Sequence, residues 1–88
     1  MLETIREPVD VVAVFAAGKI QPKIFRWKSR TYRVEKINLV YSARDGNDRV
    51  VYFAVSDGAN YFKLAYNAGN FSWILQEIYS DIPSAHYR

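Results

Sequence analysis

The feature that most restricts the fold of this chain is the regular return of short turn signals. Each signal supplies Gly, Asn or Asp where the backbone needs a positive φ angle, and their spacing is roughly ten to twelve residues. This spacing is typical of an antiparallel meander, in which tight loops join neighbouring strands without a crossover helix. The signals are Gly18-Lys19 with Pro22 nearby, Asp45-Gly46-Asn47-Asp48, Asp57-Gly58-Ala59-Asn60 and Asn67-Ala68-Gly69-Asn70.

The segments between these signals are rich in β-branched and aromatic residues. We therefore expect an all-β domain, an antiparallel meander of about five to six strands that forms a small twisted sheet or a half-open barrel. The Ala-rich end of the first segment is equally compatible with a short helix. The six candidate strands are Val9–Ala16, Lys23–Lys28, Thr31–Tyr41, Arg49–Val55, Tyr61–Tyr66 and Phe71–Tyr79.

Two of these segments change the phase of their alternation. In Thr31–Tyr41 the apolar residues move to the other parity near Glu35, which predicts one long strand that bends at a β-bulge. A similar slip lies between Leu75 and Ile78 in the last segment. A strand bent in this way can belong to both of the sheets that form a small barrel.

Length and composition limit the organisation and location of the chain. With 88 residues, half of them hydrophobic, it fits one domain over residues 1–81 followed by a flexible tail over 82–88. The absence of cysteine excludes disulfide scaffolds and thiolate sites, and the acidic start does not resemble a signal peptide. The longest apolar run, Val11–Ala17, is too short to span a membrane. We expect a cytoplasmic protein without a membrane partner.

The residues give little support to catalysis. His86 is the only histidine and lies in the predicted tail, where it cannot be held against a nucleophile. The oxygen ligands Asp45, Asn47 and Asp48 are explained by a hairpin turn, and the four glycines form no phosphate-binding loop. We therefore expect a binding protein and not an enzyme, with no metal and no cofactor.

Positive charge is concentrated in one segment. Seven of the twelve basic residues lie between Lys19 and Lys36, beside the single acid Glu35, although the net charge is only +3. The distribution of the basic residues along the chain is therefore more informative about a binding partner than the net charge is. The seven are Lys19, Lys23, Arg26, Lys28, Arg30, Arg33 and Lys36.

This segment predicts a hairpin with an aromatic face and a cationic face. In its first strand Phe25 and Trp27 share one parity, whereas Arg26 and Lys28 share the other. We predict that the cations hold the phosphates of a single-stranded nucleic acid while an exposed ring, Tyr32 or Tyr61, stacks on a base. The predicted nucleic-acid-binding residues are Lys23, Arg26, Lys28, Arg30, Arg33 and Tyr32.

Two other interpretations of the basic segment stay open. The cations of a solvated edge hairpin would simply discourage strand addition from another chain. Alternatively, the chain is a protein-interaction module or a homodimer that covers an exposed edge at Val9–Ala16 or Phe71–Tyr79. Most aromatic residues are expected to pack in the core, namely Trp27, Trp73, Phe53, Phe62 and Phe71, while Tyr52, Tyr61 and Tyr79 suit the surface.

The segments Trp27–Val34 and Trp73–Tyr79 resemble a family of small bacterial domains without assigned function. That family has a Trp-basic-Gly-Arg-x-Tyr-x-Val hairpin and a closing strand with Trp. In this chain Ser29 stands in the place of the Gly. The resemblance covers Lys23–Tyr79 and implies the β fold, without implying an activity.

Overall fold

Each turn signal separates two strands in the computed structural model, which describes residues 1–80. Within these residues every element of regular secondary structure is a β-strand, so the predicted all-β class is confirmed. The predicted tail over 82–88, with His86, lies outside the described residues. The strands are β1 (Leu2–Pro8), β2 (Asp10–Ala16), β3 (Lys19–Trp27), β4 (Arg30–Arg33), β5 (Lys36–Asp45), β6 (Asp48–Ser56), β7 (Tyr61–Asn67) and β8 (Ser72–Tyr79).

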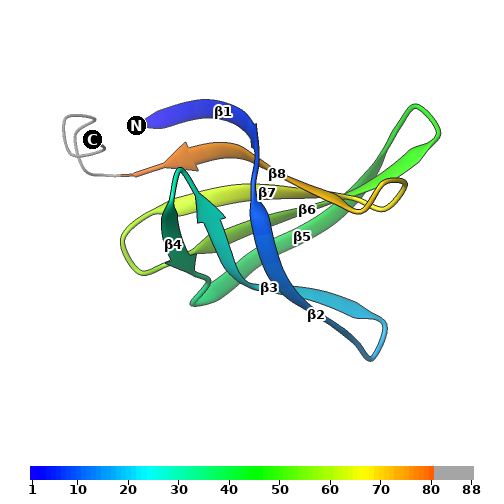
Figure 1. Cartoon of the computed structure of the whole chain (residues 1–88), viewed down its shortest axis with the longest axis horizontal. Coiled ribbons are helices and arrows are strands. Elements are labelled where there is room, and N and C mark those ends of the chain that lie inside the picture. The colour runs from blue at the N-terminus through cyan, green and yellow to red at the C-terminus, as the bar shows by residue number, and fades with distance from the viewer. Residues whose placement is uncertain (81–88) are drawn as a thin grey trace.

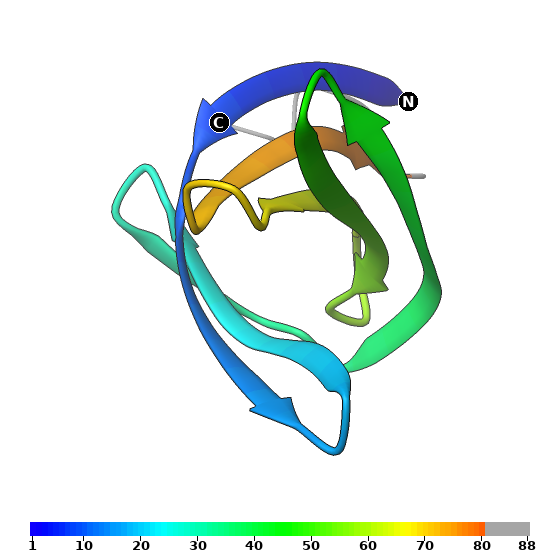
Figure 2. The same cartoon turned by 90° about the vertical axis from the view of Figure 1, so that its right-hand side faces the viewer.

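The strands form two antiparallel sheets around one core (Figure 1). The larger sheet has the order β1-β8-β7-β6-β5 and the smaller one the order β2-β3-β4. The chain passes from one sheet to the other between β1 and β2 and again between β4 and β5, so the sheets face each other across the interior (Figure 2). The result is a pair of twisted sheets and not a closed barrel.

The prediction of a single bulged strand over Thr31–Tyr41 is wrong, because this segment is divided between β4 and β5. The Val34 N–H donates to the Lys23 carbonyl oxygen in the three-stranded sheet (2.9 Å), and the next residue, Glu35, donates to Ser56 in the five-stranded sheet (2.9 Å). The chain therefore changes sheets between these two residues. A change of sheet and a bulge both move the apolar side chains to the other parity, so the pattern alone cannot separate them.

The slip in the last strand is a β-bulge, as expected. Lys63 of β7 pairs with Glu77 of β8, and the next pair is Leu64 with Leu75. Gln76 is therefore the extra residue on β8. The bulge restores the inward direction of the apolar side chains after it, because each extra residue reverses the alternation.

The edges of the sheets differ in part from the expectation. The segment Val9–Ala16 is a strand and not a helix, and within residues 1–80 its β2 pairs only with β3, so it is an edge. By contrast β8 lies between β1 and β7, so Phe71–Tyr79 is not an edge. The charged segment β1 takes that place. It was not predicted because an edge strand needs little apolar alternation.

The core lies between the inner faces of the two sheets. Phe53, Phe62 and Trp73 are buried in it as predicted, and Trp27 packs against it half-buried. Phe71 was expected to be buried, but it is 77% exposed because it belongs to the turn before β8. The buried cluster comprises Phe25, Phe53, Val55, Phe62, Leu64, Tyr66, Trp73, Leu75 and Ile78. A search of residues 1–80 for a helix long and apolar enough to cross a membrane finds none.

Candidate nucleic-acid interface

The β3–β4 hairpin carries all the residues predicted to bind nucleic acid. Because β3 ends at Trp27 and β4 begins at Arg30, Lys28 and Ser29 form a two-residue turn. Their φ angles are +52° and +65°, which is the type I′ geometry that matches the right-handed twist of paired strands. The hairpin is therefore tight and its register is well defined.

The pleat of this hairpin separates its rings from its arginines, as the alternation predicts. Phe25 pairs with Tyr32 across the two strands and is only 1% exposed. Arg26 and Arg33 take the alternate positions, point away from the core and are exposed. The outer face of the three-stranded sheet is therefore cationic.

The other predicted cations surround this face. Lys23 is exposed and is the extra residue of a bulge in the β2–β3 pairing. Lys28 lies in the turn with its Nζ 5.0 Å from the centroid of the Trp27 ring, and Arg30 pairs with Trp27 across the hairpin. The indole Nε1 of Trp27 donates to Oε1 of Glu7 at 2.8 Å, so the ring that Lys28 covers is held in place.

Two acids, Glu7 and Asp10, lie on strands beside these cations without forming ion pairs with them. Within residues 1–80 none of the hairpin cations forms an ion pair. The Glu35 carboxylate lies beside Gly58 in the β6–β7 loop, with Oε1 3.3 Å from where a Cβ on that glycine would be. Asp10 pairs in register with Arg26, so the two side chains lie on the same outer face of the sheet. The hairpin thus keeps most of its positive charge available.

Tyr32 is not the exposed ring that the sequence suggested. It stacks on Phe25 with ring centroids 5.0 Å apart and an interplanar angle of 13°, and it meets Phe62 edge-on at 5.2 Å. Tyr32 therefore packs against the core and ties the hairpin to the five-stranded sheet, because Phe62 belongs to β7. The alternative ring, Tyr61, is 50% exposed.

A second outer surface carries the exposed rings. We call it the tyrosine face; it lies on the outside of the five-stranded sheet and contains Tyr41, Tyr52, Tyr61 and Tyr79. The first two rings stack with centroids 5.0 Å apart, and the last two are 6.3 Å apart. The prediction that Tyr61 and Tyr79 suit the surface is confirmed, whereas Tyr52 lies on the same face but is half-buried. Tyr41 was missed because an irregularity at Asn38 turns it outward, and nothing in the sequence signals that irregularity.

Lys63 lies at the centre of the tyrosine face. Its Nζ is 5.6 Å from the centroid of the Tyr41 ring and 5.0 Å from that of Tyr52, and it pairs across the strands with Glu77. A side-chain hydrogen bond with Tyr41 raises the pKa of Lys63 above its ordinary value, and charge interactions with Tyr41 and Glu77 act in the same direction. Burial opposes them. The surroundings therefore favour the charged amine.

One cross-strand row connects the basic segment with the tyrosine face. Lys36 pairs with Ser56, Ser56 with Tyr61, and Tyr61 with Tyr79. Because neighbouring strands are about 4.8 Å apart, the backbones of Lys36 and Tyr61 are separated by roughly 10 Å. An exposed ring therefore lies near the end of the basic segment, although not on the hairpin itself.

Comparisons of the chain with models of protein families, with curated proteins and with solved structures find no match. The resemblance to the family with the Trp-basic-Gly-Arg hairpin therefore stays a prediction. Across residues 1–80, no three side chains among His, Cys, Asp and Glu lie close enough together to hold a metal ion. The candidate site is thus defined by the charge and exposure of the β3–β4 hairpin.

Proposed function

We propose that this protein is a binding module for single-stranded nucleic acid and that the β3–β4 hairpin provides the contact surface. The observation that carries the proposal is the exposure of Lys23, Arg26, Lys28, Arg30 and Arg33 on one small sheet, without ion pairs inside the described chain. Exposed cations that follow one surface neutralise successive phosphates and release bound counterions.

Phosphate contacts and base contacts come from different places in this proposal. Arg26 and Arg33 share the outer face of the sheet, where guanidinium groups form paired hydrogen bonds with phosphate oxygens. Tyr61 is the ring available for stacking, because Tyr32 is half-buried and packs against the core. Stacking on a tyrosine is tolerant of sequence, so the module would have little base preference.

The test is a titration of fluorescently labelled single strands at several salt concentrations. With about four phosphate contacts, the logarithm of the affinity should fall with the logarithm of the salt concentration with a slope of about −2.8. Heparin serves as a control polyanion without bases, and it should bind with a similar slope but without the contribution of Tyr61. Absence of salt-dependent binding at low ionic strength would refute the proposal.

A second candidate function is association with a protein through the free edge of β2. Val12, Val14 and Phe15 on this strand are 61%, 43% and 58% exposed, and an edge with apolar side chains favours the addition of another strand. The added strand would come from a second copy of the chain or from another protein. Light scattering over a range of protein concentrations tests the homodimer, which a strictly monomeric protein would rule out.

A further inference from the structure

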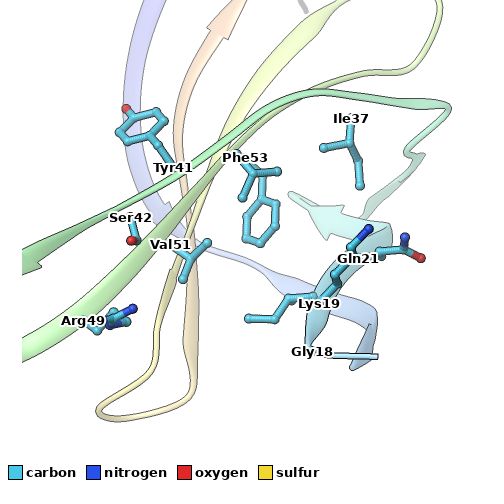
Figure 3. Close-up of a pocket in the computed structure, with 11 residues that line it drawn as sticks. Gly18, Lys19, Gln21, Ile37, Tyr41, Ser42, Arg49, Val51 and Phe53 are labelled. Carbon is cyan, nitrogen blue, oxygen red and sulfur yellow. The ribbon is translucent and has the colours of Figure 1, made fainter. Parts of the chain in front are cut away.

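Hollows of different character lie on the inner and the outer side of β3. On the inner side, a cleft between the β2–β3 and β5–β6 hairpins has a volume of about 560 Å³, and Figure 3 shows Lys19 and Arg49 at opposite ends of it. The charged residues that line this cleft therefore do not converge on one ligand. On the outer side, a smaller hollow of about 230 Å³ lies beside the exposed arginines of the β3–β4 hairpin. We call it the outer hollow.

Two neighbouring cross-strand rows form the rim of the outer hollow. In each row the residues pair directly across the strands, so their side chains point to the same face with Cβ atoms about 5 Å apart. Between the rows the side chain of Phe25 points the other way, into the core, so backbone forms the floor. The first row consists of Asp10, Arg26 and Thr31, and the second contains Val12 and Ile24.

The second row gives the outer hollow an aliphatic wall. Val12 on β2 is 61% exposed. Ile24 on β3 is half-buried and alternates with the buried Phe25, so its side chain lies on the outer face. A bound apolar group that removes this pair from water would be stabilised. The cationic face therefore contains a place for an uncharged part of a ligand.

The charges around this wall separate a site for phosphate from a site for a base. Arg33 pairs directly with Ile24, and Arg26 lies two residues further along β3 on the same face. Both guanidinium groups are available to the phosphates of a strand that crosses the sheet. The Asp10 residue lies on the rim of the hollow, where its negative charge repels a phosphate but not a neutral base. A bound nucleotide would therefore place its base, and not its phosphate, in the hollow.

We propose that the outer hollow seats a thymine base, so that the protein prefers single-stranded DNA that contains thymine. Thymine is the DNA base with a methyl group, and contact with aliphatic side chains is how proteins recognise that group. The volume of about 230 Å³ is below the range of about 300–1,000 Å³ for drug-sized ligands, which suits a single pyrimidine ring. This inference rests on the proposed function, and it adds one modest base preference to the sequence-tolerant stacking on Tyr61.

The test compares labelled single-stranded oligomers of thymidine and of deoxyuridine, which have the same charge and sugar and differ only in the methyl group. Fluorescence anisotropy at low salt should show about fourfold tighter binding of the thymidine oligomer, the effect expected when one methyl group is buried. The two salt slopes should be equal, because the phosphate contacts are the same.

Substitutions in the aliphatic wall should remove the preference. V12T and I24T keep a β-branched side chain but replace an apolar group with a hydroxyl, and each should reduce the preference for thymidine to less than about twofold. V14T is the matched control. Val14 is 43% exposed on the same face of β2 but does not line the hollow, so this variant should retain the fourfold preference. A wild-type salt slope in each variant would show that its cationic face is folded.

The outcomes separate this inference from the proposed function. Equal binding of the two oligomers with the expected salt slope would overturn the thymine site and leave nucleic-acid binding intact. Absence of salt-dependent binding of either oligomer would overturn both. A preference that persists in V12T and I24T, or that is lost equally in V14T, would place recognition of the methyl group elsewhere and would also overturn the inference.

Discussion

The outer faces of the two sheets differ in chemistry although both are exposed to water. The three-stranded sheet displays Arg26 and Arg33 and buries its rings, whereas the five-stranded sheet displays four tyrosines around Lys63. Cations without rings attract polyanions over long distances but do not distinguish bases. Tyrosines provide amphipathic contact area at short range. Charge and stacking surface are therefore divided between the two sheets.

The largest expected effect is on stability, because the buried face of the three-stranded sheet should contribute far more to the free energy of unfolding than its cationic outer face. Phe25→Ala should lower the free energy of unfolding by about 3–5 kcal/mol, because it removes a fully buried ring that packs on Tyr32 and Phe62. R26Q, one residue away on the outer face, should change it by less than about 0.5 kcal/mol. Urea unfolding measures both. Similar losses in the two variants would contradict the assignment of faces.

The next largest effect should come from removing the two arginines of the outer face. The double variant R26Q/R33Q should weaken single-strand binding about tenfold at low salt and reduce the salt slope by about 1.4, because two phosphate contacts are lost. R44Q on β5 is the control of equal chemistry and should retain the wild-type slope. Fluorescence anisotropy at several salt concentrations gives both values, and an unchanged slope in the double variant would exclude the outer face as the phosphate site.

Removing a ring from the tyrosine face should have a smaller effect of a different kind. Tyr61→Ala should lower the affinity for a single strand by about 1 kcal/mol while leaving the salt slope unchanged, because stacking releases no counterions. Tyr41→Ala, further from Lys36, should change the affinity less. Fluorescence anisotropy titrations at several salt concentrations measure the affinity and the salt slope of both variants. A reduced slope in Tyr61→Ala, or a larger effect in Tyr41→Ala, would contradict the proposed path of the strand.

The hairpin turn offers a test in the stabilising direction. Ser29 has a positive φ angle, a conformation that glycine adopts without steric cost, so Ser29→Gly should raise the free energy of unfolding by about 0.5 kcal/mol. Thr31→Gly, at an extended position in β4, should lower it by about 1 kcal/mol. Thermal unfolding compares the two variants, and a loss of stability in Ser29→Gly would contradict the turn geometry.

The smallest expected effect concerns Lys63 and depends on pH. The raised pKa of Lys63 means that its stabilising contribution is complete below its ordinary pKa and is lost as pH rises through the raised value. Lys63→Met should therefore be less stable than the wild type by about 0.5 kcal/mol near pH 8. The difference should shrink as the pH rises through the raised pKa of Lys63 and the amine loses its charge. Urea unfolding at a series of pH values measures it, and a difference that persists after the amine is neutral would show that charge is not its cause.

Some features of this protein follow from local sequence. The turn signals predict where strands end, because Gly, Asn and Asp allow backbone angles that other residues avoid. The alternation predicts that Phe25 lies inside and Arg26 outside, because successive side chains of any strand point to opposite faces. Lys28 and Ser29 also have positive φ angles although neither is Gly, Asn or Asp, so the turn signals do not account for this turn.

Other features were decided by the tertiary structure. Three features depend on which strands lie alongside, and a local pattern does not contain that information. They are the change of sheet after Val34, the outward turn of Tyr41 and the packing of Tyr32 against the core. A cleft lies between the β2–β3 and β5–β6 hairpins because these hairpins, far apart in the sequence, diverge from one core. Alternation is a property of a single strand, whereas which face is covered depends on strands that fold against it from elsewhere in the chain.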